Sequence, residues 1–219
     1  MFIKQQIEND LKTIINSKFT NDLGVNVDLC IAKCYNAAWN EVSDCISKMH
    51  SPTQLTGTDS RNVLYKRYGD YDFALIALVL IAKKWRNNLS QEAKKNLFDN
   101  LLVKRGKNVL SNLVAPFNVV PETENHLLLT NTSLYLTNEM IIEDGSKEEK
   151  YDNIKNGVHS ILKSQLEKIK NEGFYEYNSR PYCGITLRGL LVLYSCTTNE
   201  EIKILAKQIL DDTFKKYVS

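Results

Sequence analysis

Apolar residues recur at intervals of three and four through most of this chain, the spacing that gives an α-helix one hydrophobic face. Ile7, Leu11 and Ile15 show the pattern near the N-terminus. With 9 glycines and 4 prolines in 219 residues, few positions interrupt it. The sequence therefore predicts an all-α fold. The predicted helices span residues 2–17, 26–49, 72–86, 90–103, 124–142, 147–171, 182–196 and 199–216.

Residues at the ends of these segments support the boundaries. Ser90 is placed to cap the helix that follows it. Residues 146–149 and 198–201 both match the capping box, in which a hydroxyl residue and a later Glu satisfy the first backbone N–H groups. Gly173 predicts a helix end, and residues 114–123, which contain two prolines, predict a loop.

From residue 72 onward the predicted helices fall into pairs joined by short turns, and Asp72, Asn125 and Asn178 are evenly spaced along the chain. Repeated pairs predict helical hairpins arranged as an incomplete (α/α) toroid or as an array. We expect one α-helical domain over residues 1–219, with N-terminal helices in 1–55 and hairpin repeats in 56–219. The chain can itself be one part of a larger protein.

The 28 basic and 26 acidic residues nearly cancel, which leaves a formal net charge of +2. Because nucleic-acid binders carry a basic stripe or patch, we expect no nucleic-acid partner. Neither a membrane span nor a leader pattern is found, so we expect no membrane partner, and a cytoplasmic location if the chain is complete. The 5 cysteines predict reduced, buried thiols, and no metal or cofactor motif occurs.

Polar segments precede the first helix of each pair, at residues 69–73, 122–126 and 176–182. In an array of hairpins the first helices run parallel, so their N-termini meet at one end of the molecule. Unpaired N–H groups and the positive helix dipole at that end favour anions or hydroxyl-rich ligands. We therefore expect a polar site where these segments meet.

Two of these segments resemble motifs of a known family: residues 122–126, Glu-Thr-Glu-Asn-His, and residues 176–182, Glu-Tyr-Asn-Ser-Arg-Pro-Tyr. The family comprises large bacterial proteins related to the six-hairpin (α/α)-toroid glycosidases and polysaccharide lyases. Other similar segments are 70–73, 131–138 and 206–212. The resemblance covers residues 55–215 and implies an oligosaccharide or polysaccharide as partner, without a cofactor. A closed ring of six hairpins needs more helices than this chain supplies, so further domains or copies would complete it.

The residue types in these motifs suit two reactions. In glycoside hydrolysis, Glu124 and Glu176 would act as a pair of carboxylates. In β-elimination from a uronate, His126 and Tyr182 would transfer the protons, while Asn125 or Arg180 would hold the sugar carboxylate. The candidate catalytic residues are Glu124, His126, Glu176 and Tyr182, and the candidate substrate-binding residues are Asp72, Asn125, Tyr177, Asn178 and Arg180.

Structural roles are the alternative for the same residues. Glu124 can complement a helix dipole that also lowers the pKa of His126, and Asp72 can cap a helix start. Arg180 can form a structural ion pair with a glutamate. The alternative function is a non-catalytic helical-repeat module that binds a protein or a glycan through a concave face.

Overall fold

The computed structural model describes residues 2–20, 22–50, 71–106, 123–175 and 179–218. Its α-helices are α1 (Phe2–Ile15), α2 (Leu23–Tyr35), α3 (Trp39–Lys48), α4 (Tyr71–Trp85), α5 (Gln91–Asn96), α6 (Glu124–Glu143), α7 (Val158–Glu172), α8 (Arg180–Cys196) and α9 (Glu200–Val218). No strand occurs in these residues, so the predicted all-α fold class is confirmed. The toroid stays a prediction.

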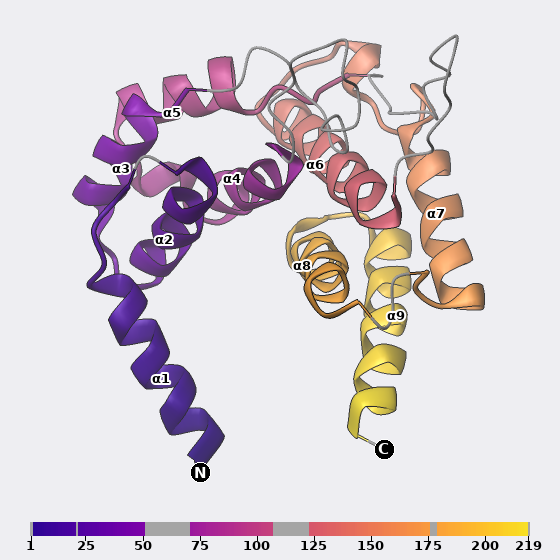
Figure 1. Cartoon of the computed structure of the whole chain (residues 1–219). Coiled ribbons are helices and arrows are strands. Elements are labelled where there is room, and N and C mark those ends of the chain that lie inside the picture. Colours follow the sequence, from indigo (N-terminus) through magenta and orange to yellow (C-terminus); the bar gives the residue numbers. More distant parts are fainter. Residues whose placement is uncertain (1, 21, 51–70, 107–122, 176–178, 219) are drawn as a thin grey trace, which may run out of the picture.

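Helices α4 and α6 lie side by side at the centre of the molecule, with α2, α3 and α5 on one side and α7, α8 and α9 on the other (Figure 1). The side chains of α4 from Ala74 to Val79 are all buried. Helix α6 is buried on almost every face between Asn125 and Asn138, although about half of those residues are polar. A helix enclosed on all sides must find partners for its polar groups inside the protein.

The three inner helices α4, α6 and α8 run in the same direction, as the hairpin pattern predicts. Near the start of α4, Asp72 contacts His126 at the start of α6, and near its end Lys83 pairs with Glu139 at 3.2 Å. The end of α8 joins the same corner, because Glu139 accepts a hydrogen bond of 2.8 Å from the Thr197 hydroxyl. Their N-termini therefore share one end of the molecule.

The predicted helix over residues 26–49 is wrong, because the chain breaks there into α2 and α3. The break lies at residues 36–38, where Ala37 adopts a left-handed φ of 56°. Such a conformation is unfavourable for a residue with a Cβ and ends a helix. Behind the turn, Lys33 of α2 pairs with Glu41 of α3 at 2.8 Å and closes the hairpin. Tertiary contacts thus override a continuous helical pattern.

The capping box at residues 146–149 is also wrong as a helix start, since α7 begins only at Val158. A single 3-10 turn, Glu149–Tyr151, and further turns occupy the intervening chain. Gly157 precedes α7 with a φ of 86°, and the Asn156 side chain accepts from the Val158 N–H at 2.9 Å. Asparagine side chains in this segment bind α6 and its neighbours, which holds the backbone out of a helix.

Other predicted boundaries agree with the structure. The Ser90 hydroxyl caps α5 by accepting from the Ala93 N–H at 3.2 Å, and α5 continues into a π-helical turn, Leu97–Leu101. Gly173 ends α7 with a φ of 81°. The start of α9 agrees as a boundary, but the predicted capping box is wrong in its cap residue. The Thr198 hydroxyl donates to Glu139, and the cap is Asn199, whose Oδ1 accepts from the Ile202 N–H at 3.1 Å. The predicted loop over residues 114–123 lies almost entirely outside the described residues.

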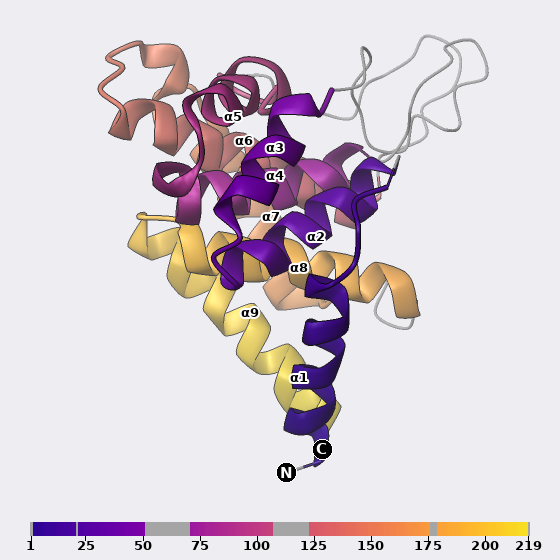
Figure 2. The same ribbon diagram turned by 90° about the vertical axis from the view of Figure 1, so that its left-hand side faces the viewer.

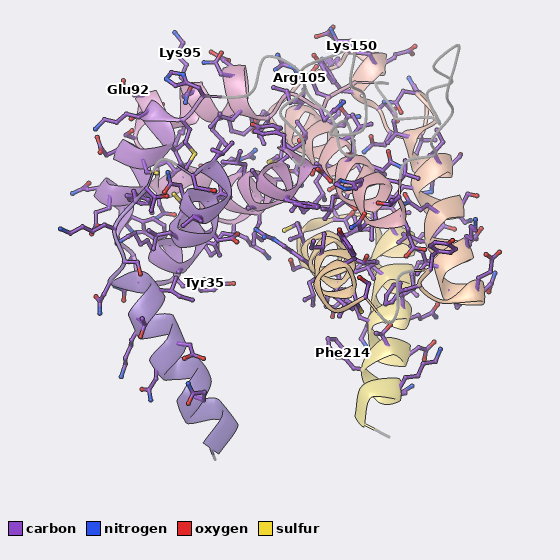
Figure 3. The ribbon with its side chains drawn as sticks, in the orientation of Figure 1. Tyr35, Glu92, Lys95, Arg105, Lys150 and Phe214 are labelled. Atoms are coloured by element: carbon purple, nitrogen blue, oxygen red, sulfur yellow. The ribbon has the colours of Figure 1, made fainter. Side chains whose placement is uncertain are left out.

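Helices α1 and α9 both extend from the same side of the molecule and carry the two chain ends (Figure 2). The charged side chains of Glu92, Lys95, Arg105 and Lys150 lie at the periphery, away from the contact between α4 and α6 (Figure 3). None of the helices in the described ranges is long and apolar enough to cross a lipid bilayer.

Candidate functional site

A buried carboxylate–imidazole pair lies where α4 and α6 begin. Asp72 Oδ2 is 2.7 Å from His126 Nδ1, and both side chains are almost completely buried. The Phe73 ring stacks on the imidazole with ring centroids 4.9 Å apart. Two first-turn residues from helices far apart in sequence thus hold each other in place. Asp72 lies inside α4 and contacts His126, so its side chain does more than cap a helix.

A carboxylate that accepts from the Nδ1–H of histidine fixes the orientation of the ring and favours the tautomer in which Nε2 is the basic nitrogen. Many enzymes that use histidine as a general base orient it with a carboxylate in this way. It also occurs as a purely structural contact in protein interiors. The neighbouring groups therefore decide which of the two roles the Asp72–His126 pair can have.

Asn125, the neighbour of His126 in the chain, is 0% exposed. Its Oδ1 accepts a hydrogen bond from the Thr123 hydroxyl and another, 2.7 Å long, from the His126 N–H. Its Nδ2 has no hydrogen-bond partner in the described part of the chain. Buried amide groups are nearly always paired, because leaving one unpaired costs about 1–3 kcal/mol. The Asn125 Nδ2 is thus a buried donor, next to His126 in the chain, with no partner among the described residues.

Glu124 begins α6 and connects it with the segment that enters α8. Its Oε2 accepts from the Tyr175 N–H at 3.5 Å. Glu124, from the first motif, is therefore adjacent to Tyr175, which comes directly before the second motif in the chain. Tyr182, in the first turn of α8, is 42% exposed, and Tyr175 is also exposed. The site thus combines buried polar groups on α4 and α6 with exposed aromatic side chains on α8 and the segment before it.

The remaining predicted site residues are not placed by the structure. Glu176, Tyr177 and Asn178 lie outside the described residues. Arg180 begins α8, but its side chain is likewise outside the described part. The pairing of the Glu124 and Glu176 carboxylates therefore stays a prediction. Within the described residues, no group of three or more His, Cys, Asp or Glu side chains could hold a metal ion.

A stripe of hydroxyl residues along α6 was missed by the sequence reasoning. Thr130, Ser133 and Thr137 follow His126 at helical spacing and are all buried. The Ser133 and Thr137 hydroxyls have no hydrogen-bond partner in the described ranges. The signal was present in the sequence, because these residues share one helix face with His126. Phe73 was also missed as a partner of His126, although it adjoins Asp72.

Comparisons with known proteins give no match, either to a family model, to a curated protein or to a solved structure. The resemblance to the toroid glycosidases and lyases is therefore untested.

Proposed function

We propose that the end of the molecule where α4, α6 and α8 begin is a carbohydrate site, at which an oligosaccharide or polysaccharide linkage is cleaved by β-elimination or hydrolysis. The observation that carries the proposal is the buried Asp72–His126 pair beside the Asn125 Nδ2, which has no partner among the described residues. Glu124 and Tyr182 belong to the same end of the inner helices. These types of side chain are the ones from which sugar-cleaving sites are built.

Elimination is the reaction that the described residues support better. It requires a base that takes the proton next to a uronate carboxylate, a donor that stabilises the negative charge developing on that carboxylate, and an acid for the leaving oxygen. His126, oriented by Asp72, suits the base, and the Asn125 amide suits the donor. The exposed Tyr182 hydroxyl suits the acid. Hydrolysis needs a second carboxylate, and its predicted source, Glu176, lies outside the described residues.

A second function is favoured by a different observation. Asp72, Asn125 and His126 are all buried, with His126 only 4% exposed, whereas Tyr175 and Tyr182 are exposed. Exposed tyrosines suit stacking on a sugar ring or packing against a protein, without any reaction. A non-catalytic helical-repeat module that binds a glycan or a protein through this end is therefore the alternative.

The decisive experiment is an assay of the whole chain against uronate-containing and neutral glycans. Elimination is followed by the ultraviolet absorption of the unsaturated product and hydrolysis by new reducing ends. Asp72→Asn is the key variant, because it keeps a hydrogen-bonding side chain of the same shape but removes the charge that orients His126. We expect it to lower turnover by about 100-fold or more while leaving the melting temperature within a few degrees.

His159→Ala is the matched control, because His159 also pairs with a carboxylate, at 3.0 Å from Glu201, but lies on α7. It is expected to leave turnover unchanged. A chain that binds a glycan saturably but releases no product, and whose binding is weakened by Tyr182→Ala, would support the non-catalytic binding module over the enzyme. Neither binding nor turnover on any uronate or neutral glycan would end the carbohydrate proposal.

A further inference from the structure

The first turn of α4 presents three consecutive side chains, each with a contact of its own. The buried Tyr71 hydroxyl donates to the Leu101 carbonyl at 2.8 Å. Asp72 Oδ2 lies 2.7 Å from His126 Nδ1. Phe73 stacks on the same imidazole, with ring centroids 4.9 Å apart and ring planes 15° from parallel. Two adjacent residues of α4 thus contact one histidine of α6.

The two contacts reach different parts of the His126 ring. A hydrogen bond to Nδ1 lies at the edge of the imidazole, in its plane, whereas a stacked ring covers one of its faces. Neighbouring residues on a helix point about 100° apart, so one side chain can contact both of them only where it lies across the turn. His126 lies across the first turn of α4 in this way. Asp72 and Phe73 therefore hold the imidazole from two directions.

The side chains that hold the imidazole are themselves fixed. Asp72 is 3% exposed, and the hydrogen bond of Tyr71 anchors the residue before it to Leu101. Phe73 is half-buried and packs against the hydrophobic core. Because closely packed side chains keep their rotamers, the core sets the plane of the Phe73 ring, and the imidazole stacked on it shares that plane. The orientation of His126 thus depends on the packing of α4 as well as on the Asp72 carboxylate.

His159 shows the arrangement of a histidine without such stacking. Its Nε2 lies 3.0 Å from Glu201 Oε2, so it also pairs with a carboxylate. The Tyr135 ring, however, is tilted by 43° to the imidazole, with ring centroids 6.1 Å apart, and contacts it through the hydroxyl. His159 is also only half-buried, whereas His126 is buried. A carboxylate partner is common to both histidines, and the stacked ring distinguishes His126.

We infer that Phe73 is a positioning residue of the candidate site, which sets the plane of the His126 imidazole while Asp72 sets its tautomer. The two roles are separate, because a stacked ring covers the whole face and does not select which nitrogen carries the proton, whereas a carboxylate at one edge does. Together they aim Nε2 in one direction. The catalytic consequence rests on the proposed function: a base that is already aimed at the proton it takes reacts faster than one that must first rotate.

The first test needs no substrate and uses NMR spectra of the full chain, isotopically labelled at the histidine nitrogens. The carbon-bound ring protons of His126 should resonate upfield, because they lie over the Phe73 ring. Phe73→Leu, which keeps an apolar side chain but removes the ring, should lose this upfield shift and keep the nitrogen shifts of the Nδ1–H tautomer. Asp72→Asn should do the reverse. Phe73→Tyr should match the wild type, and the His159 signals should stay unchanged throughout.

The second test is turnover of a glycan that the wild-type chain cleaves, at a temperature where every variant is folded. Because Phe73 acts through His126, Phe73→Leu should lower kcat about tenfold with KM unchanged, and Phe73→Tyr should keep the wild-type rate. Phe73→Met, which also lacks a ring, takes the place of Phe73→Leu if the latter does not fold.

Three results would overturn the positioning role of Phe73. They are an upfield shift that survives in Phe73→Leu, nitrogen shifts of His126 that change in that variant, and a raised KM with unchanged kcat, which would make Phe73 a direct substrate contact. Turnover that is unchanged in Phe73→Leu would overturn that role alone. If the spectra show both contacts but no glycan is cleaved, the proposed function and the positioning role fall together.

Discussion

Two asparagines on α6, Asn125 and Asn138, are both 0% exposed, yet their side chains have different surroundings. Asn138 Oδ1 accepts from the Gly106 N–H at 2.6 Å, and its Nδ2 donates at 2.9 Å to both the Gly106 carbonyl and Asn153 Oδ1. Every polar atom of that amide is therefore paired. Asn125, at the other end of the helix, keeps an Nδ2 with no partner among the described residues. Burial alone does not distinguish the two; the pairing of their atoms does.

The network around Asn138 continues outward. Asn153 Nδ2 donates to the Tyr135 carbonyl at 3.0 Å, and Asn156 Nδ2 donates to the Gly106 carbonyl at 3.2 Å. These amides fix the turn at Gly106 and the chain before α7 onto the central helix. A closed set of bonds of this kind stabilises one conformation and leaves nothing for a ligand. At Asn125 the set of hydrogen bonds is incomplete, because Nδ2 has no partner among the described residues.

The largest effect on stability is expected from Asn138→Ala. It removes three hydrogen bonds and leaves the Gly106 N–H, the Gly106 carbonyl and Asn153 less satisfied inside the protein. We expect the free energy of unfolding to fall by about 3 kcal/mol, measured by urea denaturation with an unchanged m-value. A loss below about 1 kcal/mol would mean that the network contributes little and that the contrast between the two asparagines is wrong.

Asn125→Ala should cost less, about 1 kcal/mol in the same measurement, because the side chain makes fewer hydrogen bonds and already carries one unpaired group. The same variant should abolish the binding of any glycan that raises the melting temperature of the wild-type chain. Asn138→Ala, compared at a temperature where both variants are folded, should keep that binding. The reverse order of stabilities would assign the structural role to Asn125 instead.

The smallest effect on stability is expected from the hydrogen bonds that link Tyr135 of α6 to the exposed Glu201 through His159. The Tyr135 hydroxyl contacts His159 Nδ1 at 3.3 Å, and His159 Nε2 contacts Glu201. Hydrogen bonds from Lys163 and then His159 lower the pKa of Glu201. A lowered pKa in the folded state contributes stability that is present above the unfolded pKa and is lost as the pH falls through the folded pKa.

Glu201→Gln should therefore be slightly less stable than the wild type at neutral pH, and the difference should disappear on acidification through that lowered pKa. Thermal melts from neutral pH to below the ordinary glutamate pKa measure it. Because the carboxylate is exposed, solvent screens the effect. A difference that grows as the pH falls would show that the pKa shift has the opposite sign.

Much of the secondary structure follows from local pattern. The predicted helix 124–142 matches α6, Gly173 ends α7, and Ser90 caps α5. Asp72 and His126 could be placed at the same end of the fold because hairpin helices alternate in direction. The 2.7 Å contact between them could not, since helix spacing and rotation depend on side chains from every neighbour.

In two segments the local sequence pattern predicted helix incorrectly. Helical spacing runs through residues 36–38, and a capping box stands at 146–149, yet neither segment is helical as predicted. Contacts across each segment accompany the break: Lys33 binds Glu41, eight residues further along the chain, and Asn156 binds Gly106, 50 residues away. Contacts of this kind outweigh intrinsic helix propensity, which amounts to less than about 1 kcal/mol per residue for most residue types.

The sequence by itself determined that this chain is all-α, where most of its helices begin and end, and that polar motifs precede the inner helices. These properties are local, because they depend on apolar periodicity and on capping groups a few residues apart. Only the tertiary structure decided which buried amides are paired and that Asp72 meets His126. Those contacts join residues far apart in the chain, and the packing of whole helices sets their distances.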